Sequence, residues 1–340
     1  INPYQSLESS LFYFRFIFFV FAVILLVDRF PNLINIFGIS IILTLLFITV
    51  DAYYQYFTGI NFLGMKKELV GRLSGAFHDE YKLGSYLSRL MPFVFFYLAS
   101  LKSTKSWMMW LAMFFLISID ILIYIAGERT AFFYLFLVTI SIIVFTNKFK
   151  LIRLFALFAT ILLIISLNIF YPDVKNRMIN QTINQIGLIK GNINPTTAQV
   201  SENMYIFSIN HQAHFVTAYK MFLDKPFFGH GPKKFRILCD NEKYIEPYGC
   251  ATHPHNTYAQ LLAETGIIGT LTILSLFLFV VYIFIRQFFS LYFIKKKQNS
   301  DYFLNDSKIC LYIAILVSLW PLIPTGNFFG NWNSIIYFLP

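Results

Sequence analysis

Long apolar segments alternate with short polar turns along most of this chain. A membrane span needs about 20 predominantly apolar residues, and eight stretches approach that length. They lie near residues 10–27, 33–50, 84–101, 107–126, 130–147, 151–170, 266–288 and 308–324. The pattern predicts an all-α integral membrane protein, a polytopic helical bundle.

The spans divide the chain into three segments. Residues 1–170 hold about six spans with short loops, residues 171–256 form one long loop domain, and residues 257–340 hold the C-terminal spans. The chain begins at Ile1 without a methionine, and the apolar stretch that starts near residue 332 is too short to cross a membrane. We therefore expect further spans beyond both ends.

Composition supports a membrane protein and excludes two other classes. Hydrophobic residues make up 57% of the chain and charged residues 13%, with a mean hydropathy of +0.62. Soluble proteins carry about 25% charged residues, so a soluble enzyme and a disordered chain are both excluded. The net charge of +10 is compatible with nucleic-acid binding, but no nucleic-acid-binding motif accompanies it.

Basic turns set the expected orientation. They lie at residues 102–105, 148–153 and 286–308, and strict alternation of the spans places all three on one side, which the positive-inside rule makes cytoplasmic. The opposite, exported side then carries residues 58–83, the turn at 127–130 and the long loop. Basic residues in 58–83 run against the rule, which favours an anionic ligand there; they are Lys66, Lys67, Arg72 and Lys82.

The long loop concentrates residues with chemical function. Five of the six histidines and two of the three cysteines fall within residues 171–256, and loops beyond about 15 residues are usually functional. Apolar spacing predicts helices near residues 174–189 and 213–222. An oxidising exported compartment favours a disulfide between Cys239 and Cys250.

The segment 252–269, THPHNTYAQLLAETGIIG, places His253 and His255 where a loop enters a helix. A neutral imidazole can take a proton from an attacking hydroxyl, and Asn256 or Thr257 can cap the helix. Simple loop packing remains an alternative for a single His-x-His. A zinc site that adds His211 and His214 is another, although no His-Glu-x-x-His motif accompanies it.

Arginines supply the expected anion-binding groups. Arg129 lies between two apolar spans, where a charge is costly unless it meets a partner or an anionic ligand; a structural pair with Glu128 or Asp120 is the alternative. Further basic residues on the exported side are Arg72, Arg177, Lys233, Lys234 and Arg236. Guanidinium groups suit phosphate because they donate two parallel hydrogen bonds, although interfacial basic residues also contact lipid headgroups.

Three motifs together resemble the O-antigen ligase/polymerase superfamily of bacterial envelopes. They are HPHN at 253–256 leading to GIIG at 266–269, PFFGHGP at 226–232, and GERTA at 127–131, within a match over about residues 50–290. The resemblance implies a GT-C-like bundle in the bacterial inner membrane that faces the periplasm. It also implies a glycosyltransferase that moves a glycan from undecaprenyl pyrophosphate to an acceptor sugar, with no metal and no cofactor.

The resemblance also implies roles for individual residues. His255 would deprotonate the acceptor hydroxyl, and Arg129 would hold the lipid pyrophosphate, with Arg177 as a further phosphate contact. Many relatives carry an arginine in the loop helix before the glycine turn, where this chain has His211 and His214. The remaining candidates for substrate binding are Arg72, His253 and Arg236.

Several functions remain open at this point. A ligase would join the glycan to a lipid A core, whereas a polymerase would join repeat units, and both share these motifs. A transporter for lipid-linked glycans is a second class, but it predicts ionisable residues deep in several spans beyond Arg15, Arg89 and Asp120. A membrane zinc hydrolase is a third. The expected partners are the lipid-linked donor, the acceptor and membrane lipids, with no nucleic acid.

Overall fold

The computed structural model describes residues 4–186, 204–293 and 304–340, except for Glu68, Val70, Asp79 and Thr104. Within these residues the fold is helical, and the sole β contact is the isolated bridge between Ile60 and Lys66. The helices are α1 (Tyr4–Tyr13), α2 (Arg15–Arg29), α3 (Leu33–Thr58), η1 (Gly75–Phe77), α4 (Leu83–Ser100), α5 (Ser106–Ile125), α6 (Arg129–Phe145), α7 (Lys150–Phe170), α8 (Pro172–Lys175), η2 (Asn176–Asn180), α9 (Gln181–Ile186), α10 (Ile209–Asp224), α11 (Phe235–Leu238), α12 (Thr257–Tyr292), α13 (Asp306–Ser318) and α14 (Asn331–Phe338). The predicted all-α class is confirmed.

Helices occupy all eight predicted spans. In the described part of the chain, five helical stretches are long and apolar enough to cross a membrane: Ser9–Arg29, Leu33–Thr58, Ser106–Ile125, Lys150–Phe170 and Thr257–Tyr292. The other three predicted spans fall on α4, α6 and α13. The last of these ends at Ser318 rather than near residue 324, because Pro321 and Pro324 lack the N–H that continues a helix. The protein is a multi-pass membrane protein.

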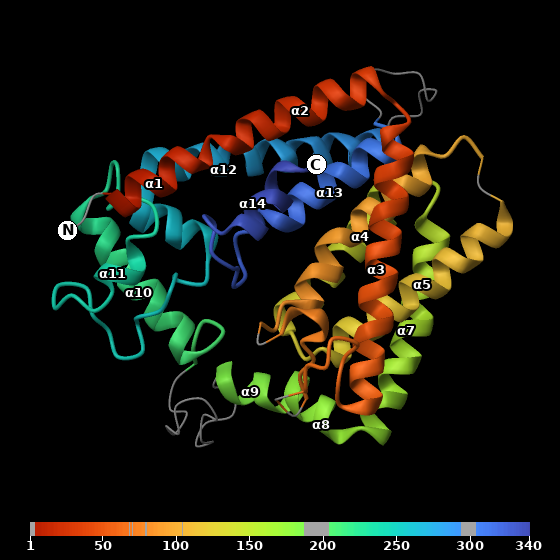
Figure 1. Ribbon diagram of the computed structural model, residues 1–340, viewed down its shortest axis with the longest axis horizontal. Coiled ribbons are helices and arrows are strands. Elements are labelled where there is room, and N and C mark those ends of the chain that lie inside the picture. The colour runs from red at the N-terminus through yellow and green to blue at the C-terminus, as the bar shows by residue number, and fades with distance from the viewer. Residues whose placement is uncertain are drawn as a thin grey trace. The chain divides into compact units, whose positions relative to one another are not determined.

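The helices form two compact units that cut across the three sequential segments (Figure 1). Unit 1 consists of Ile1–Asp28, Gln181–Phe279 and Ser318–Pro340, and unit 2 of Arg29–Asn180 and Val280–Val317. The candidate histidines belong to unit 1. The candidate arginines of the 58–83 loop, the 127–131 turn and η2 belong to unit 2.

Unit 2 is a bundle in which α4 packs against α3, α5 and α6, and α7 packs against α5 and α6 (Figure 1). A buried ion pair crosses this bundle. Arg153 Nη1 lies 2.7 Å from Asp120 Oδ2, and both side chains are fully buried; Thr160 donates to the same carboxylate over 3.1 Å. Arg153, which the sequence placed with the basic turn at 148–153, therefore lies within α7, where its side chain is buried with a partner, as a charge in lipid requires.

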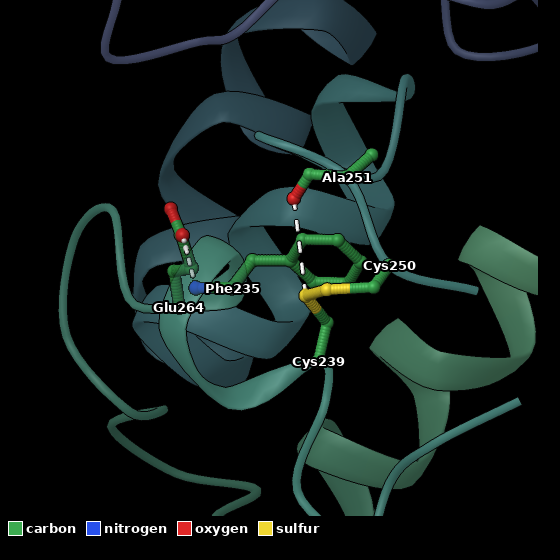
Figure 2. Close-up of a disulfide and its surroundings, with 5 residues drawn as sticks. All are labelled: Phe235, Cys239, Cys250, Ala251 and Glu264. Atoms are coloured by element: carbon green, nitrogen blue, oxygen red, sulfur yellow. Dashed lines mark hydrogen bonds between the residues drawn. A yellow bond between two sulfur atoms is a disulfide. The ribbon is translucent and has the colours of Figure 1, made fainter. Parts of the chain in front are cut away.

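Unit 1 contains a small core around a disulfide. Side chains of α10, α11 and the start of α12 enclose it, among them Met221, Phe235 and Ala263. Cys239 and Cys250 are joined there, with their Cα atoms 4.9 Å apart, and Figure 2 shows this bond beside Phe235 and Glu264. The bond ties the loop between the two cysteines to the segment that carries His253 and His255.

A break in α12 anchors the glycine turn at residues 226–232. Gly266 has φ 65° and ψ −165°, a conformation that is essentially restricted to glycine. The turn pairs with the helix on both sides of the break, because Gly231 N donates to Glu264 O and Ile267 N donates to Pro226 O, each over 2.8 Å. A Cβ on Gly266 would collide with the backbone of Phe227.

We expect Gly266→Ala to lower the free energy of unfolding by about 3 kcal/mol, because backbone strain and a steric clash add together. Thermal unfolding of the purified protein in detergent, followed by circular dichroism, measures the change. Gly64→Ala is the matched control: Gly64 also has a positive φ, of 79°, but open space around it, so only about 1 kcal/mol of strain applies. Equal losses of unfolding free energy in the two variants would contradict the close packing of the glycine turn against Gly266.

Candidate functional site

Three arginines meet in unit 2, where the loop before η1, the start of α6 and η2 come together. Gly127, at φ 70°, permits this approach, since a Cβ there would collide with the carbonyl oxygen of Gly71 and would lie 3.3 Å from Arg177 Cγ. Arg177 Nε donates to Gly127 O over 3.4 Å, and Leu73 N donates to Ala126 O. We call Arg72, Arg129 and Arg177 the arginine cluster.

The positive charges of the arginine cluster repel one another. Burial and the charge of Arg177 lower the pKa of Arg72, and burial lowers the pKa of Arg177. The positive charges of Arg177 and Arg72 also repel that of Arg129. Compensation comes from the ring of Tyr81, 4.0 Å from the Arg72 guanidinium, and from Glu128, which attracts Arg72. An anionic ligand would relieve the repulsion that remains.

The acidic residues expected as structural partners of Arg129 bind elsewhere. Glu128 accepts hydrogen bonds from Gly84 N over 2.6 Å and from Ser85 Oγ over 2.9 Å, so it caps the start of α4, where a carboxylate is stabilised by the helix dipole. Burial raises the pKa of Glu128 to about 6. Asp120 pairs with Arg153. Glu128 and Asp120 therefore each serve a contact of their own in the bundle.

Four imidazoles meet in unit 1, and we call them the histidine cluster: His211, His214, His253 and His255. The first two project from α10 and the last two from the loop before α12. Ring centroids are 4.2 Å apart for His253–His255, 5.2 Å for His214–His255, 5.7 Å for His211–His255 and 6.3 Å for His211–His214. Ser208 caps α10, and its Oγ lies 2.7 Å from His211 Nδ1.

The segment after α13 holds His255 in place. His255 has a left-handed backbone, with φ 54°, and its carbonyl oxygen accepts from Thr325 N over 2.8 Å. Asn256 caps α12 through Ala259 N, as the sequence predicted, and its Nδ2 donates to Pro321 O over 2.8 Å. The apolar pattern alone gave no sign of this support, because it extends the predicted span through residues 319–324; the two prolines were the available signal.

Burial makes three of these imidazoles, those of His214, His253 and His255, weaker bases. It lowers the pKa of His255 and, together with the charge of His255, that of His214 to about 4. Burial and then the charges of His255 and Arg236 lower the pKa of His253 to about 3. These rings are therefore neutral at pH 7. A neutral imidazole can accept a proton or hydrogen-bond a hydroxyl.

The structure offers no preformed metal site in the histidine cluster. Among the described residues, the His, Cys and acidic groups whose ligand atoms lie within 4.8 Å of one another are Cys239, Asp240 and Cys250, and these two sulfurs are bonded to each other. The geometry therefore gives no support to a zinc hydrolase that uses the four histidines.

The basic residues after the glycine turn lie in different environments. Lys234 is buried, whereas Lys233 and Arg236 line a pocket of about 380 Å³ that also contains Arg15. Glu264 is fully buried and accepts from Phe235 N over 2.8 Å (Figure 2), so it supports the start of α11. Arg236 is thus outside the histidine cluster but close enough for its charge to act on His253.

One family matches this chain. Residues 111–274 match the family model described as O-antigen ligase. This range includes the whole histidine cluster, Arg129, Arg177 and Arg236, and it leaves Arg72 outside. No protein of curated function and no solved structure matches the chain.

We expect acid to destabilise the protein through His214 and His253. Their folded-state pKa values lie below the ordinary value near 6.5, so the unfolded chain binds protons first as the pH falls below 6.5. Lowering the pH from 7 to 5 should therefore cost about 1–2 kcal/mol for each histidine. Chemical unfolding at both pH values measures the loss.

The matched comparison is the double variant His214→Gln, His253→Gln, which should lose less stability between pH 7 and pH 5. Glu128 has a raised pKa and so stabilises the fold on acidification, but it contributes equally to both proteins. An identical acid dependence in the two proteins would contradict the assigned neutrality.

Proposed function

Because residues 111–274 place this chain in the O-antigen ligase superfamily, we propose that it is a glycan ligase of the inner membrane. It would transfer a glycan from undecaprenyl pyrophosphate to a sugar of the lipid A core at the periplasmic face. The observation that carries the proposal is that one chain holds two kinds of group: a half-buried cluster of like-charged guanidiniums, and a histidine cluster in which burial lowers the pKa of His214, His253 and His255.

The transfer needs a base at the acceptor. The acceptor oxygen forms a bond to the anomeric carbon and gives its proton to His255, while the bond from that carbon to the pyrophosphate oxygen breaks and its electron pair leaves with the pyrophosphate. A lowered pKa keeps His255 unprotonated, which a general base requires. The constrained backbone at His255, held by Thr325, supports a fixed position for the ring.

The leaving group needs positive charge. Negative charge develops on the pyrophosphate as the bond breaks, and fixed guanidiniums stabilise that transition state more than the ground state. Arg129, Arg177 and Arg72 provide this charge, and the mutual repulsion of their guanidiniums supports an anionic occupant. No metal or cofactor is part of the proposal.

The remaining histidines would orient sugar hydroxyls. His211 and His214 both project from α10, and a neutral imidazole such as that of His214 can both donate and accept hydrogen bonds. His253 is partly engaged, since its Nε2 lies 3.3 Å from Thr325 O, so it would position the loop as well as the acceptor.

The buried charges of unit 2 argue against a transporter. Arg153 pairs with Asp120, and Arg89 Nη2 donates to Tyr134 OH over 3.0 Å. A transport path needs ionisable groups that exchange partners with a cargo, whereas these groups bind one another inside the bundle. They therefore support a fixed scaffold for an enzyme.

We expect His255→Ala and Arg129→Ala each to reduce glycan transfer by at least ~100-fold, because each removes a group that acts in the transition state. Transfer from purified lipid-linked donor to acceptor, followed by gel mobility, measures the loss. Protein abundance in the membrane should remain normal.

The control variants are His230→Gln and Arg29→Gln. His230 lies outside the histidine cluster, with its Nε2 3.0 Å from Met221 O, and glutamine can keep that contact. Arg29 is an exposed residue at the end of α2. Both should retain transfer; full activity of either test variant would reject the role of that residue.

Deletion of the gene distinguishes a ligase from a polymerase. A missing ligase should cause undecaprenyl-linked long chains to accumulate, because polymerisation continues without delivery to the lipid A core. Mass spectrometry of extracted lipid-linked glycans makes the measurement. Accumulation of single linked repeats would reject the ligase and indicate a polymerase.

A further inference from the structure

A separate basic pocket lies within unit 1. Its volume is about 380 Å³, and its wall combines parts of the chain that are distant in sequence. The α1–α2 region contributes Tyr13, Arg15 and Phe16, the α11 region Lys233 and Arg236, and α14 contributes Asn331. Among the described residues that line it, none is acidic. The described part of the wall therefore presents three positive charges and no negative one.

Local contacts position the positive charges. Arg15 donates to Asn331 Oδ1, and its guanidinium lies 4.9 Å from the centroid of the Phe16 ring. Lys233 adopts φ 60°, a conformation that costs a non-glycine residue about 1 kcal/mol. Glu264 stabilises this conformation, since it accepts from the backbone of Lys233 and from Phe235 N. A buried carboxylate thus fixes the backbone that carries Lys233.

Aromatic rings form the rest of the wall. The Tyr13 ring lies 5.3 Å from that of Phe16 and 5.5 Å from that of Phe329, centroid to centroid. Aromatic faces accept the apolar face of a sugar or a lipid chain, whereas lysine and arginine bind phosphate oxygens. The wall therefore matches a phosphate joined to an apolar or sugar moiety better than a free simple anion.

We propose that this pocket binds a phosphate ester, supplied by the headgroup of an anionic lipid or by a phosphorylated sugar. It is distinct from the arginine cluster, which belongs to unit 2, and nothing in the proposed transfer reaction requires it. The charge of Arg236 acts on His253, so an anion bound here would partly neutralise a charge that the histidine cluster experiences.

The test measures binding without any glycan transfer, so its outcome is independent of the proposed function. The protein is reconstituted in phosphatidylcholine nanodiscs with or without phosphatidylglycerol, and native mass spectrometry counts the phosphatidylglycerol retained. A second arm titrates glucose 6-phosphate, with glucose as the blank, into protein in phosphatidylcholine nanodiscs. Retention of phosphatidylglycerol identifies a lipid headgroup as the source, and binding of glucose 6-phosphate identifies a sugar phosphate.

The variant Lys233→Gln, Arg236→Gln should weaken binding of whichever probe the wild type binds by about tenfold or more, because two charge-assisted contacts are lost. Arg15→Gln should weaken binding of the same probe. Because Arg15 lies on a different segment, this second loss would not be explained by a local folding defect at α11. The matched control Lys225→Gln, Lys243→Gln removes the same charge from exposed lysines of unit 1 outside the pocket. Equal binding by the wild type and the pocket variants, or no binding of either probe to the wild type, would overturn the proposal.

Discussion

The architecture depends on one constraint: backbone N–H and C=O groups at a membrane must be paired within the protein. Irregular segments therefore occur where another segment bonds to them. Residues 226–232 pair across the break at Gly266, Thr325 pairs with His255, and Leu73 pairs with Ala126. Each of these contacts lies next to candidate site residues, so tertiary hydrogen bonds hold the non-helical backbone that the proposed chemistry needs.

The two clusters use burial in opposite ways. In the histidine cluster burial removes charge, since it lowers the pKa of His214 and His253 far below neutral pH, and the rings become acceptors. In the arginine cluster the pKa of Arg72 and Arg177 is lowered from a much higher starting value. The guanidiniums therefore stay charged and continue to repel one another. Proton transfer at one group and charge stabilisation at another are the requirements of glycosyl transfer from a pyrophosphate.

Sequence reasoning predicted the elements better than their connections. The helices at the eight predicted spans, five of them long and apolar enough to cross a membrane, were recognisable because about 20 apolar residues have few alternatives to a membrane helix. The caps of α10 and α12 follow local rules. The burial of Arg153 against Asp120, the support of His255 by Thr325 and the role of Glu264 at Lys233 join residues that are distant in sequence. Spacing along one chain contains no information about such contacts, although prolines at 321 and 324 did indicate that α13 ends early.

The histidines of α10 have an electrostatic consequence for unit 1. This helix presents His211 and His214, and His214 is neutral at pH 7. Permanent positive charge lies instead on Arg15, Lys233 and Arg236 around the basic pocket. Near the histidine cluster an anionic substrate would be attracted by Arg236 rather than by His214 and His253, because burial prevents these two imidazoles from becoming charged before the pH falls to about 4 or below.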